Sequence, residues 1–395
     1  ILAGIFLILM GLCHFGTLIR FIPYTITTGF TAGIAVTIVI GQLKDFFGVT
    51  YPDGVKPIET MEKLHAFVEN CGTVNLSAVI VGVVSLAILI ISPYIFKKIP
   101  GSLLAVVAGI LMVKFLPLKA STIGDLYSIS NALPGFHLPA LSLAAVEDAI
   151  PNAFTIAVLA AIESLLSCVV ADGMINGKHR SDMELVAQGA GNIASALFGG
   201  IPATGAIART AANIKNGGRT PIAGMVHSIT LVLVLVVLMP YAGMIPMPTI
   251  AAILFVVAYN MCQWRPFTHL IQTAPKSDIL VLLVTFFLTV VFDLVVAIEI
   301  GMLLTCLLFM KRMSDETHMD RWTYVDDDSD AVNDHMQKLA KEIRVYEITG
   351  PLFFGAANAI EHIVVKDFTK CLVLRMRSVP ALDSTAMNKL QNLVK

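Results

Sequence analysis

The sequence predicts an α-helical polytopic membrane protein that ends in a small α/β domain. The chain is 56% hydrophobic and 14% charged, and its mean hydropathy is +0.80. An average soluble domain is roughly 25% charged. Long apolar runs recur up to Arg312, after which the composition becomes polar and then alternates over short stretches. These observations predict a transmembrane domain over residues 1–312, a linker over 313–341 and an α/β domain over 342–395.

Apolar runs form the predicted membrane segments. A helix needs about 20 residues to cross a bilayer, so the runs at 102–115, 203–214 and 248–261 are too short to cross alone. We expect half-helices or strongly tilted pieces there. The piece at 203–214 is the most polar of the three, which makes it the best candidate for lining a site. The runs lie at 1–22, 25–47, 74–96, 102–115, 146–172, 184–198, 203–214, 221–241, 248–261, 278–291 and 294–310.

Basic residues orient these segments. If the segments alternate in direction, Lys97-Lys98, Lys178 to Arg180 and Lys311-Arg312 fall on one side, whereas the loop over 45–70 is rich in acids. Lys and Arg mark the cytoplasmic side of a membrane protein. We therefore expect a multi-pass protein whose carboxyl-terminal domain lies in the cytoplasm.

The last part of the chain reads as alternating strands and helices. Residues 343–348 and 371–376 have the pattern of strands, whereas 356–365 and 385–394 have that of helices, and Gly350-Pro351 marks a turn. Strands that alternate with helices indicate an α/β domain.

The most informative stretch is the break at Gly199 to Thr210. Irregular backbone is tolerated at bilayer depth where it lines a cavity or is buried in protein. A helix that begins at Ala203 would direct unpaired N–H groups and the positive end of its dipole at whatever lies in front of Pro202. Transporters use broken helices in this way to bind anionic groups. The alternative is a proline-kinked helix whose arginine only packs or reaches the cytoplasmic face. The predicted anion-binding residues are Ala203, Thr204, Gly205, Ala206, Ala208 and Arg209.

Glu163 lies in the middle of an apolar run. Acids at bilayer depth are costly and are functional by default, so we predict that Glu163 takes a coupling ion, with Ser167 one turn further along. The alternative is an acid that only holds helices together. Asp172, at the end of the same run, is expected to cap or pair at the cytoplasmic rim rather than to bind substrate.

Several function classes are disfavoured. The sequence shows no nucleotide-phosphate loop and no catalytic triad, so we predict no enzyme, no metal site and no organic cofactor. The net charge of −1 gives no reason to expect nucleic acid as a partner. The six cysteines are scattered without metal-binding spacing and are read as free thiols.

Four stretches together resemble the SulP family of anion transporters, relatives of the sulfate permeases and of prestin. The tail resembles a STAS domain, the usual partner in that family. The resemblance implies fourteen membrane segments in two inverted seven-segment repeats, divided into core and gate domains, with the anion between two half-helices of the core. On that map the chain lacks the first three segments and the end of the STAS domain, so we expect a fragment. The stretches are Gly29 to Ala35, Ala161 to Ser167, Val170 to Gly173 and Gly199 to Arg219.

The resemblance also implies a function. We expect a secondary active transporter of a small anion (sulfate, bicarbonate, chloride or a dicarboxylate) in a bacterial cytoplasmic membrane, working by elevator-type alternating access. The family has anion-contacting positions at Ala208 and Arg209 and a cation-coupling acid at Glu163. A glutamate there favours proton coupling, whereas Ser167 leaves sodium open. A homodimer and a cytoplasmic partner of the STAS domain are expected as well.

Three alternatives remain at this stage. A nucleobase–cation symporter has a similar fold, but Arg209 and the tail argue against it. An uncoupled anion channel or exchanger would ignore cation gradients. A membrane scaffold that acts through its STAS domain would need neither Glu163 nor a broken helix.

Overall fold

The computed structural model describes residues 1–17, 23–52, 54–96, 99–116, 118–127, 132–138, 142–292, 294–322, 343–363 and 369–394. The chain forms two compact units, Ile1–Gly301 and Met302–Lys395, and the boundary between them along the sequence falls within one helix. The predicted cytoplasmic cluster Lys97-Lys98 lies outside the described residues.

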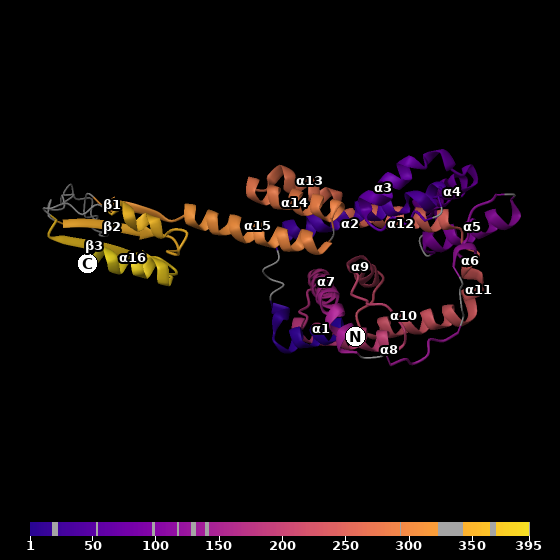
Figure 1. The fold of residues 1–395 in the computed structure, drawn as a ribbon, viewed down its shortest axis with the longest axis horizontal. Helices are drawn as coiled ribbons and strands as arrows, with labels where there is room; N and C mark the ends of the chain where they lie inside the picture. The colour runs from indigo at the N-terminus through magenta and orange to yellow at the C-terminus, as the bar shows by residue number, and fades with distance from the viewer. Residues whose placement is uncertain are drawn as a thin grey trace. The chain divides into compact units, whose positions relative to one another are not determined.

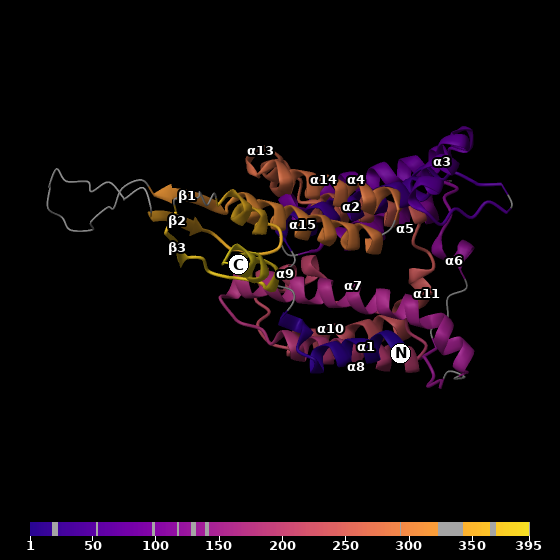
Figure 2. The same ribbon diagram turned by 60° about the vertical axis from the view of Figure 1, so that its left-hand side comes forward.

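The first unit is helical, as Figures 1 and 2 show. A π-helical turn, η3 (Val234–Leu238), joins α10 to α11, and a 3-10 turn, η2 (Cys71–Thr73), follows α3. The helices are α1 (Leu2–Leu12), α2 (Tyr24–Phe47), α3 (Thr60–Glu69), α4 (Leu76–Ile95), α5 (Gly101–Phe115), α6 (Ile123–Leu126), α7 (Leu143–Ile175), α8 (Ser181–Leu197), α9 (Ile207–Lys215), α10 (Ile222–Leu233), α11 (Met239–Ala242), α12 (Met247–Cys262), α13 (Trp264–Thr273), α14 (Lys276–Val291) and the start of α15 (Leu294–Asp315).

Two sets of helices each enclose an apolar cluster of their own. In the first set, α1, α8 and α9 pack on α7, and α1 also packs on α8. In the second set, α2 packs on α12 and α14, and α4 packs on α5 and α12. The first cluster includes Leu7, Ala157, Leu165 and Leu185, and the second includes Phe46, Leu89, Ala105, Ala251 and Ala252.

Five helices of the described chain are long and apolar enough to cross a membrane. They cover Tyr24–Phe47, Leu76–Ile95, Leu143–Ile175, Ile222–Ala242 and Met247–Thr273, and α1 and α5 are shorter apolar helices. The bounds of the first four agree with the predicted runs within three residues, whereas the fifth extends twelve residues beyond the predicted run 248–261. The run predicted over 1–22 becomes α1 at Leu2–Leu12, and its last residues, 18–22, lie outside the described chain.

Three expectations about helices were wrong. The half-helix expected to begin at Ala203 begins at Ile207, with Ala206 as its amino-terminal cap. The acidic loop over 45–70 contains α3, and the run at 248–261, predicted to be too short to cross alone, extends with α13 into a stretch, Met247–Thr273, that is long enough to cross. Both α3 and α13 are amphipathic helices of ten residues, too short and too polar for a search based on apolar runs to detect.

The second unit is an α/β fold, as predicted. Its three-stranded sheet has the order β1-β2-β3, with β1 antiparallel and β3 parallel to β2. A core around Ile348, Leu352, Ile360 and Ala386 lies between the sheet and the helical elements. The strands are β1 (His318–Trp322), β2 (Ile343–Thr349) and β3 (Cys371–Ser378), and the helical elements are η4 (Ala357–His362) and α16 (Ser384–Val394).

Two details of this unit differ from the sequence reading. Strand β1 falls inside the segment predicted as a linker, because its pairing partner β2 supplies the hydrogen bonds that a polar five-residue strand needs. The helix expected over 356–365 is a short 3-10 element, η4. The acidic run Asp326 to Asp330 lies outside the described residues.

Candidate functional site

The candidate site lies where α7, α8 and the extended segment 201–206 meet at the start of α9. Figures 1 and 2 show α7, α8 and α9 together in the first set of helices. Helix α8 ends at Leu197, and Gly199 then adopts a φ of +71°, which a residue without a side chain accepts readily. The chain stays extended until α9 begins.

The start of α9 is open. No side chain in the described part of the chain caps this helix. The first N–H groups of a helix have no partner inside it, so those of Ile207, Ala208 and Arg209 are available to a ligand. The Arg209 side chain is exposed in the same turn. Among the residues that the structure describes, it forms no hydrogen bond or ion pair. Open N–H groups, the positive end of a helix dipole and a free guanidinium together favour an anion.

Not every residue predicted to bind the anion is free to do so. The Ala203 N–H donates to Asn192 Oδ1 at 2.7 Å, and the Ala203 carbonyl accepts from Asn192 Nδ2 at 2.9 Å. The Thr204 hydroxyl donates to the Ala160 carbonyl at 2.9 Å. Ala203 and the Thr204 side chain therefore hold the segment in place, and Ala206 is the residue before the first turn of α9, without a side-chain cap bond.

Gly205 lies against α7. A Cβ at this position would lie 3.4 Å from the Ser164 Cα and 3.6 Å from the Ser167 Cβ, which is ordinary contact. Ser167 is buried, and its hydroxyl donates to the Thr210 hydroxyl at 2.8 Å. The structure thus brings Ser167, Gly205 and the first turns of α9 together.

Glu163 lies on α7, one turn before Ser167. Residues four apart share one face of a helix, so the two side chains are neighbours along α7. Glu163 is half-buried. It has no hydrogen bond or ion pair with any residue in the described ranges, so its carboxyl group is free to bind a cation or a proton.

Sequence reasoning missed a polar stripe on α8. Ser164 donates to Glu184 Oε1 at 2.5 Å, and Gln188 Nε2 donates to the Ala203 carbonyl. Asn192, next along the stripe, forms the pair with Ala203. The stripe could have been found, because Glu184, Gln188 and Asn192 recur every four residues within a predicted membrane segment.

Asp172 closes the turn between α7 and α8, as expected of a rim residue. Its Oδ2 accepts from the His179 N–H at 2.9 Å and lies 2.7 Å from His179 Nδ1. The other ring nitrogen of His179 lies 2.9 Å from the Ser181 hydroxyl. The hydrogen bonds therefore run from an aspartate through a histidine to a serine, as in a hydrolase triad, and the sequence did not reveal this arrangement. Here they tie the end of α7 to the first turn of α8.

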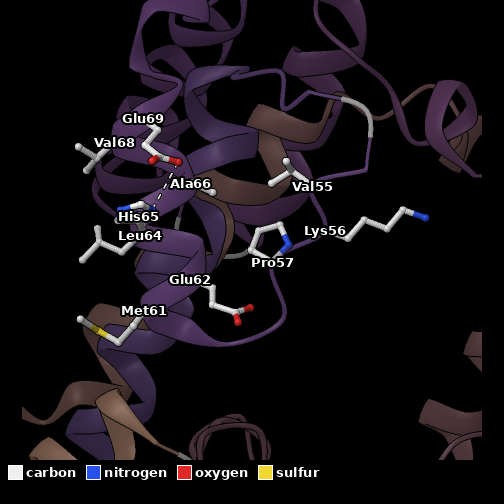
Figure 3. A pocket seen from close by; sticks show the side chains of 10 residues that line it. All are labelled: Val55, Lys56, Pro57, Met61, Glu62, Leu64, His65, Ala66, Val68 and Glu69. Carbon is white, nitrogen blue, oxygen red and sulfur yellow. Dashed lines mark ion pairs between the residues drawn. The ribbon is translucent and has the colours of Figure 1, made fainter.

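A separate cavity of about 860 Å³ opens beside α3 (Figure 3). It is lined by residues 55–57 and one side of α3, including Met61, Leu64 and Val68, and the His65–Glu69 ion pair of 3.4 Å lies at its edge. None of its lining residues belongs to α7, α8 or α9. The polar contacts at the start of α9, rather than this cavity, define the candidate site.

The helical fold, with five helices in the described residues long and apolar enough to cross a membrane, is that of a multi-pass membrane protein. Residues 1–285 match the model of the sulfate permease family, so the chain belongs to that family, which consists of transporters and not of enzymes.

Curated relatives and solved structures agree. The chain is 39% identical over 410 residues to the putative sulfate transporter YvdB of Bacillus subtilis, covering 100% of this chain and 73% of that protein. It is 32% identical over 403 residues to the bicarbonate transporter BicA of Picosynechococcus, covering 100% of this chain and 70% of that protein. The inward-facing murine anion transporter Slc26a9 has the same fold, with a TM-score of 0.82 at 19% identity over 99% of this chain and 66% of that one.

Proposed function

We propose that this protein is a secondary active transporter of a small anion, namely sulfate, bicarbonate or a dicarboxylate, driven by protons that move with the anion. The observation that carries the proposal is the uncapped start of α9 with exposed Arg209 in its first turn. The names of the relatives, a putative sulfate transporter and a bicarbonate transporter, support the same substrate class.

In this proposal the anion binds at the first turn of α9. The N–H groups of Ile207, Ala208 and Arg209 and the Arg209 guanidinium contact it, while Gly205 leaves room beside α7. Backbone N–H groups bind any small oxyanion, so discrimination among anions depends on the shape of the site.

Glu163 is the proposed proton acceptor. Its carboxyl group lacks a partner among the described residues. A proton bound to it would offset the negative charge of the anion, and this matters because charges interact strongly in the low-dielectric interior of a membrane protein. The Ser167 and Thr210 hydroxyls, 2.8 Å apart, offer oxygen atoms to sodium, so sodium is the second candidate for the coupling ion.

The proposed transport step is an elevator movement. The two sets of helices each bury an apolar cluster, as expected of two bodies that shift against one another as units. The first set, which carries α9, would take the anion past the second. We propose further that the protein is a homodimer in a bacterial cytoplasmic membrane. The α/β unit would lie in the cytoplasm and act as a STAS domain that binds a cytoplasmic partner.

Uptake into proteoliposomes by the full-length protein tests the proposal. Radiolabelled sulfate, bicarbonate and fumarate are offered with and without an inward proton or sodium gradient. Wild type is compared with Glu163→Gln and with Glu299→Gln, a matched control because Glu299 is an exposed acid on another apolar helix, α15. We expect proton-driven uptake of one anion, lost in Glu163→Gln and kept in Glu299→Gln.

Other outcomes assign other functions. Uptake driven only by a sodium gradient would show that the coupling ion is sodium and not a proton. Uptake that ignores both gradients and survives Glu163→Gln would indicate a channel or exchanger. Uptake of radiolabelled uracil in place of any anion would identify a nucleobase symporter, and no uptake at all would favour a scaffold.

A further inference from the structure

The extended segment before α9 is held at several points although it has no secondary structure of its own. The Gly200 N–H donates to the Ser195 carbonyl at 2.7 Å, and the Ser195 hydroxyl donates to the Ile201 carbonyl at 3.0 Å. Thr204 binds α7 through the Ala160 carbonyl. Helices α7 and α8 thus supply partners for backbone groups that have none within the segment.

Asn192 forms the central contact of this arrangement. Its side-chain amide pairs with the Ala203 peptide in both directions, accepting from the N–H at 2.7 Å and donating to the carbonyl at 2.9 Å. It also donates to the Gln188 carbonyl at 3.0 Å, one turn back on α8. The residue is 6% exposed.

These bonds use both donors of the Asn192 amide and leave one acceptor lone pair. Asn192 therefore has no N–H left to offer an anion. What it determines is where Ala203 lies, and hence where the chain turns into α9, which begins four residues later at Ile207.

We propose that Asn192 is the positioning residue of the anion site: it fixes the Ala203 peptide so that the open N–H groups of α9 point at the anion. The inference rests on the proposed function. Only a group with a donor and an acceptor side by side, matching those of a peptide, makes both bonds at once.

Three variants of the full-length protein test this role. Asn192→Leu keeps the size and removes both bonds. Asn192→Asp keeps the acceptor for the Ala203 N–H but places a second oxygen against the Ala203 carbonyl. Asn70→Leu is the matched control, because Asn70 also donates its side-chain amide to a carbonyl one turn back, Ala66, at 2.8 Å. Asn70 directly follows α3, which packs on α2 of the second set of helices.

Anion uptake in proteoliposomes and hydrogen exchange of the peptide 199–207 are measured for each. In Asn192→Leu we expect the anion concentration for half-maximal uptake to rise about tenfold, as the loss of two hydrogen bonds implies. The maximal rate should stay within about twofold, and amide exchange in 199–207 should be faster. Asn70→Leu should match wild type in all three.

Asn192→Asp separates positioning from simple packing. At low pH the introduced carboxyl group gains a proton and can again donate to the Ala203 carbonyl. The ratio of its half-maximal concentration to that of wild type should therefore fall toward one as the pH is lowered, whereas the ratio for Asn192→Leu should not change.

A half-maximal concentration in Asn192→Leu within about twofold of wild type, or exchange of 199–207 as slow as in wild type, would overturn the inference while leaving the proposed function intact. A lower maximal rate with an unchanged half-maximal concentration would also overturn it. If wild type shows no saturable anion uptake, the proposed function fails, and the positioning role fails with it.

Discussion

Helices α1 and α8 approach each other so closely that glycine is required at their crossing. A Cβ on Gly189 would lie 2.5 Å from the Gly4 carbonyl oxygen and 2.7 Å from Ile8 Cγ1. The relation is mutual, since a Cβ on Gly4 would lie 2.6 Å from the Gly189 carbonyl oxygen. Small residues permit such close contact between membrane helices. We predict that Gly189→Ala destabilises the protein by forcing α1 and α8 apart.

The expected size of the effect follows from these distances. Ordinary contact begins at 3.4 Å, so the methyl group is too close to the Gly4 oxygen by about 0.9 Å, and the obstacle is backbone that cannot rotate away. Overpacking of this kind costs about 1–3 kcal/mol. Alanine recovers about 1 kcal/mol through its better helix propensity. The free energy of unfolding should therefore fall by up to about 2 kcal/mol.

Gly191, two residues further along α8, provides the control. A Cβ there meets nothing within 4 Å, so Gly191→Ala should gain the propensity term alone, up to about 1 kcal/mol. Both variants are compared with wild type by heating the purified protein in detergent and measuring the folded fraction that remains by size-exclusion chromatography. Gly189→Ala should melt below wild type and Gly191→Ala at or above it. Equal melting temperatures for the two variants would refute the close approach of α1 and α8.

Two further predictions concern other parts of the first unit. Thr122 caps the start of α6, and both its N–H and its hydroxyl donate to Asp125 Oδ2. These two bonds, the one from the N–H more than the one from the hydroxyl, hold the pKa of Asp125 below its usual value. The stability that this cap contributes is therefore present above the usual Asp pKa of about 3.9 and is lost as the pH falls through the lower folded value. Hydrogen exchange of 122–126 should be faster in Asp125→Asn than in wild type near neutral pH, and a gap that persists well below pH 3.9 would contradict this origin. In the second set of helices, the buried hydroxyls of Ser85 and Thr249 lie 2.9 Å apart. Thr249→Val should lower the free energy of unfolding by about 1–3 kcal/mol because it leaves Ser85 unpaired. Ser85→Ala combined with Thr249→Val should cost less than the two single changes added together, and strict additivity would show that the hydroxyls do not interact.

The sequence by itself determined the long apolar helices and their order. Runs such as 25–47 and 74–96 become α2 and α4 because a long apolar stretch buries its backbone hydrogen bonds most easily as a helix. Local features also set some ends of elements: Pro23 precedes α2, and Gly48 ends it with a φ of +62°. The importance of the break after Gly199 and of Arg209 could be read from the chain alone, since both depart from an otherwise apolar pattern.

Only the tertiary structure decided how the break is used. The sequence predicted that residues 203–206 form the first turn of the helix after the break. In the structure the Ala203 N–H and carbonyl are bonded to the side chain of Asn192 on α8, and the helix begins at Ile207. The same holds for Glu184, whose bond to Ser164 joins residues 20 apart on two helices. Contacts between distant segments depend on which faces pack together, and the pattern of a single segment does not contain that information.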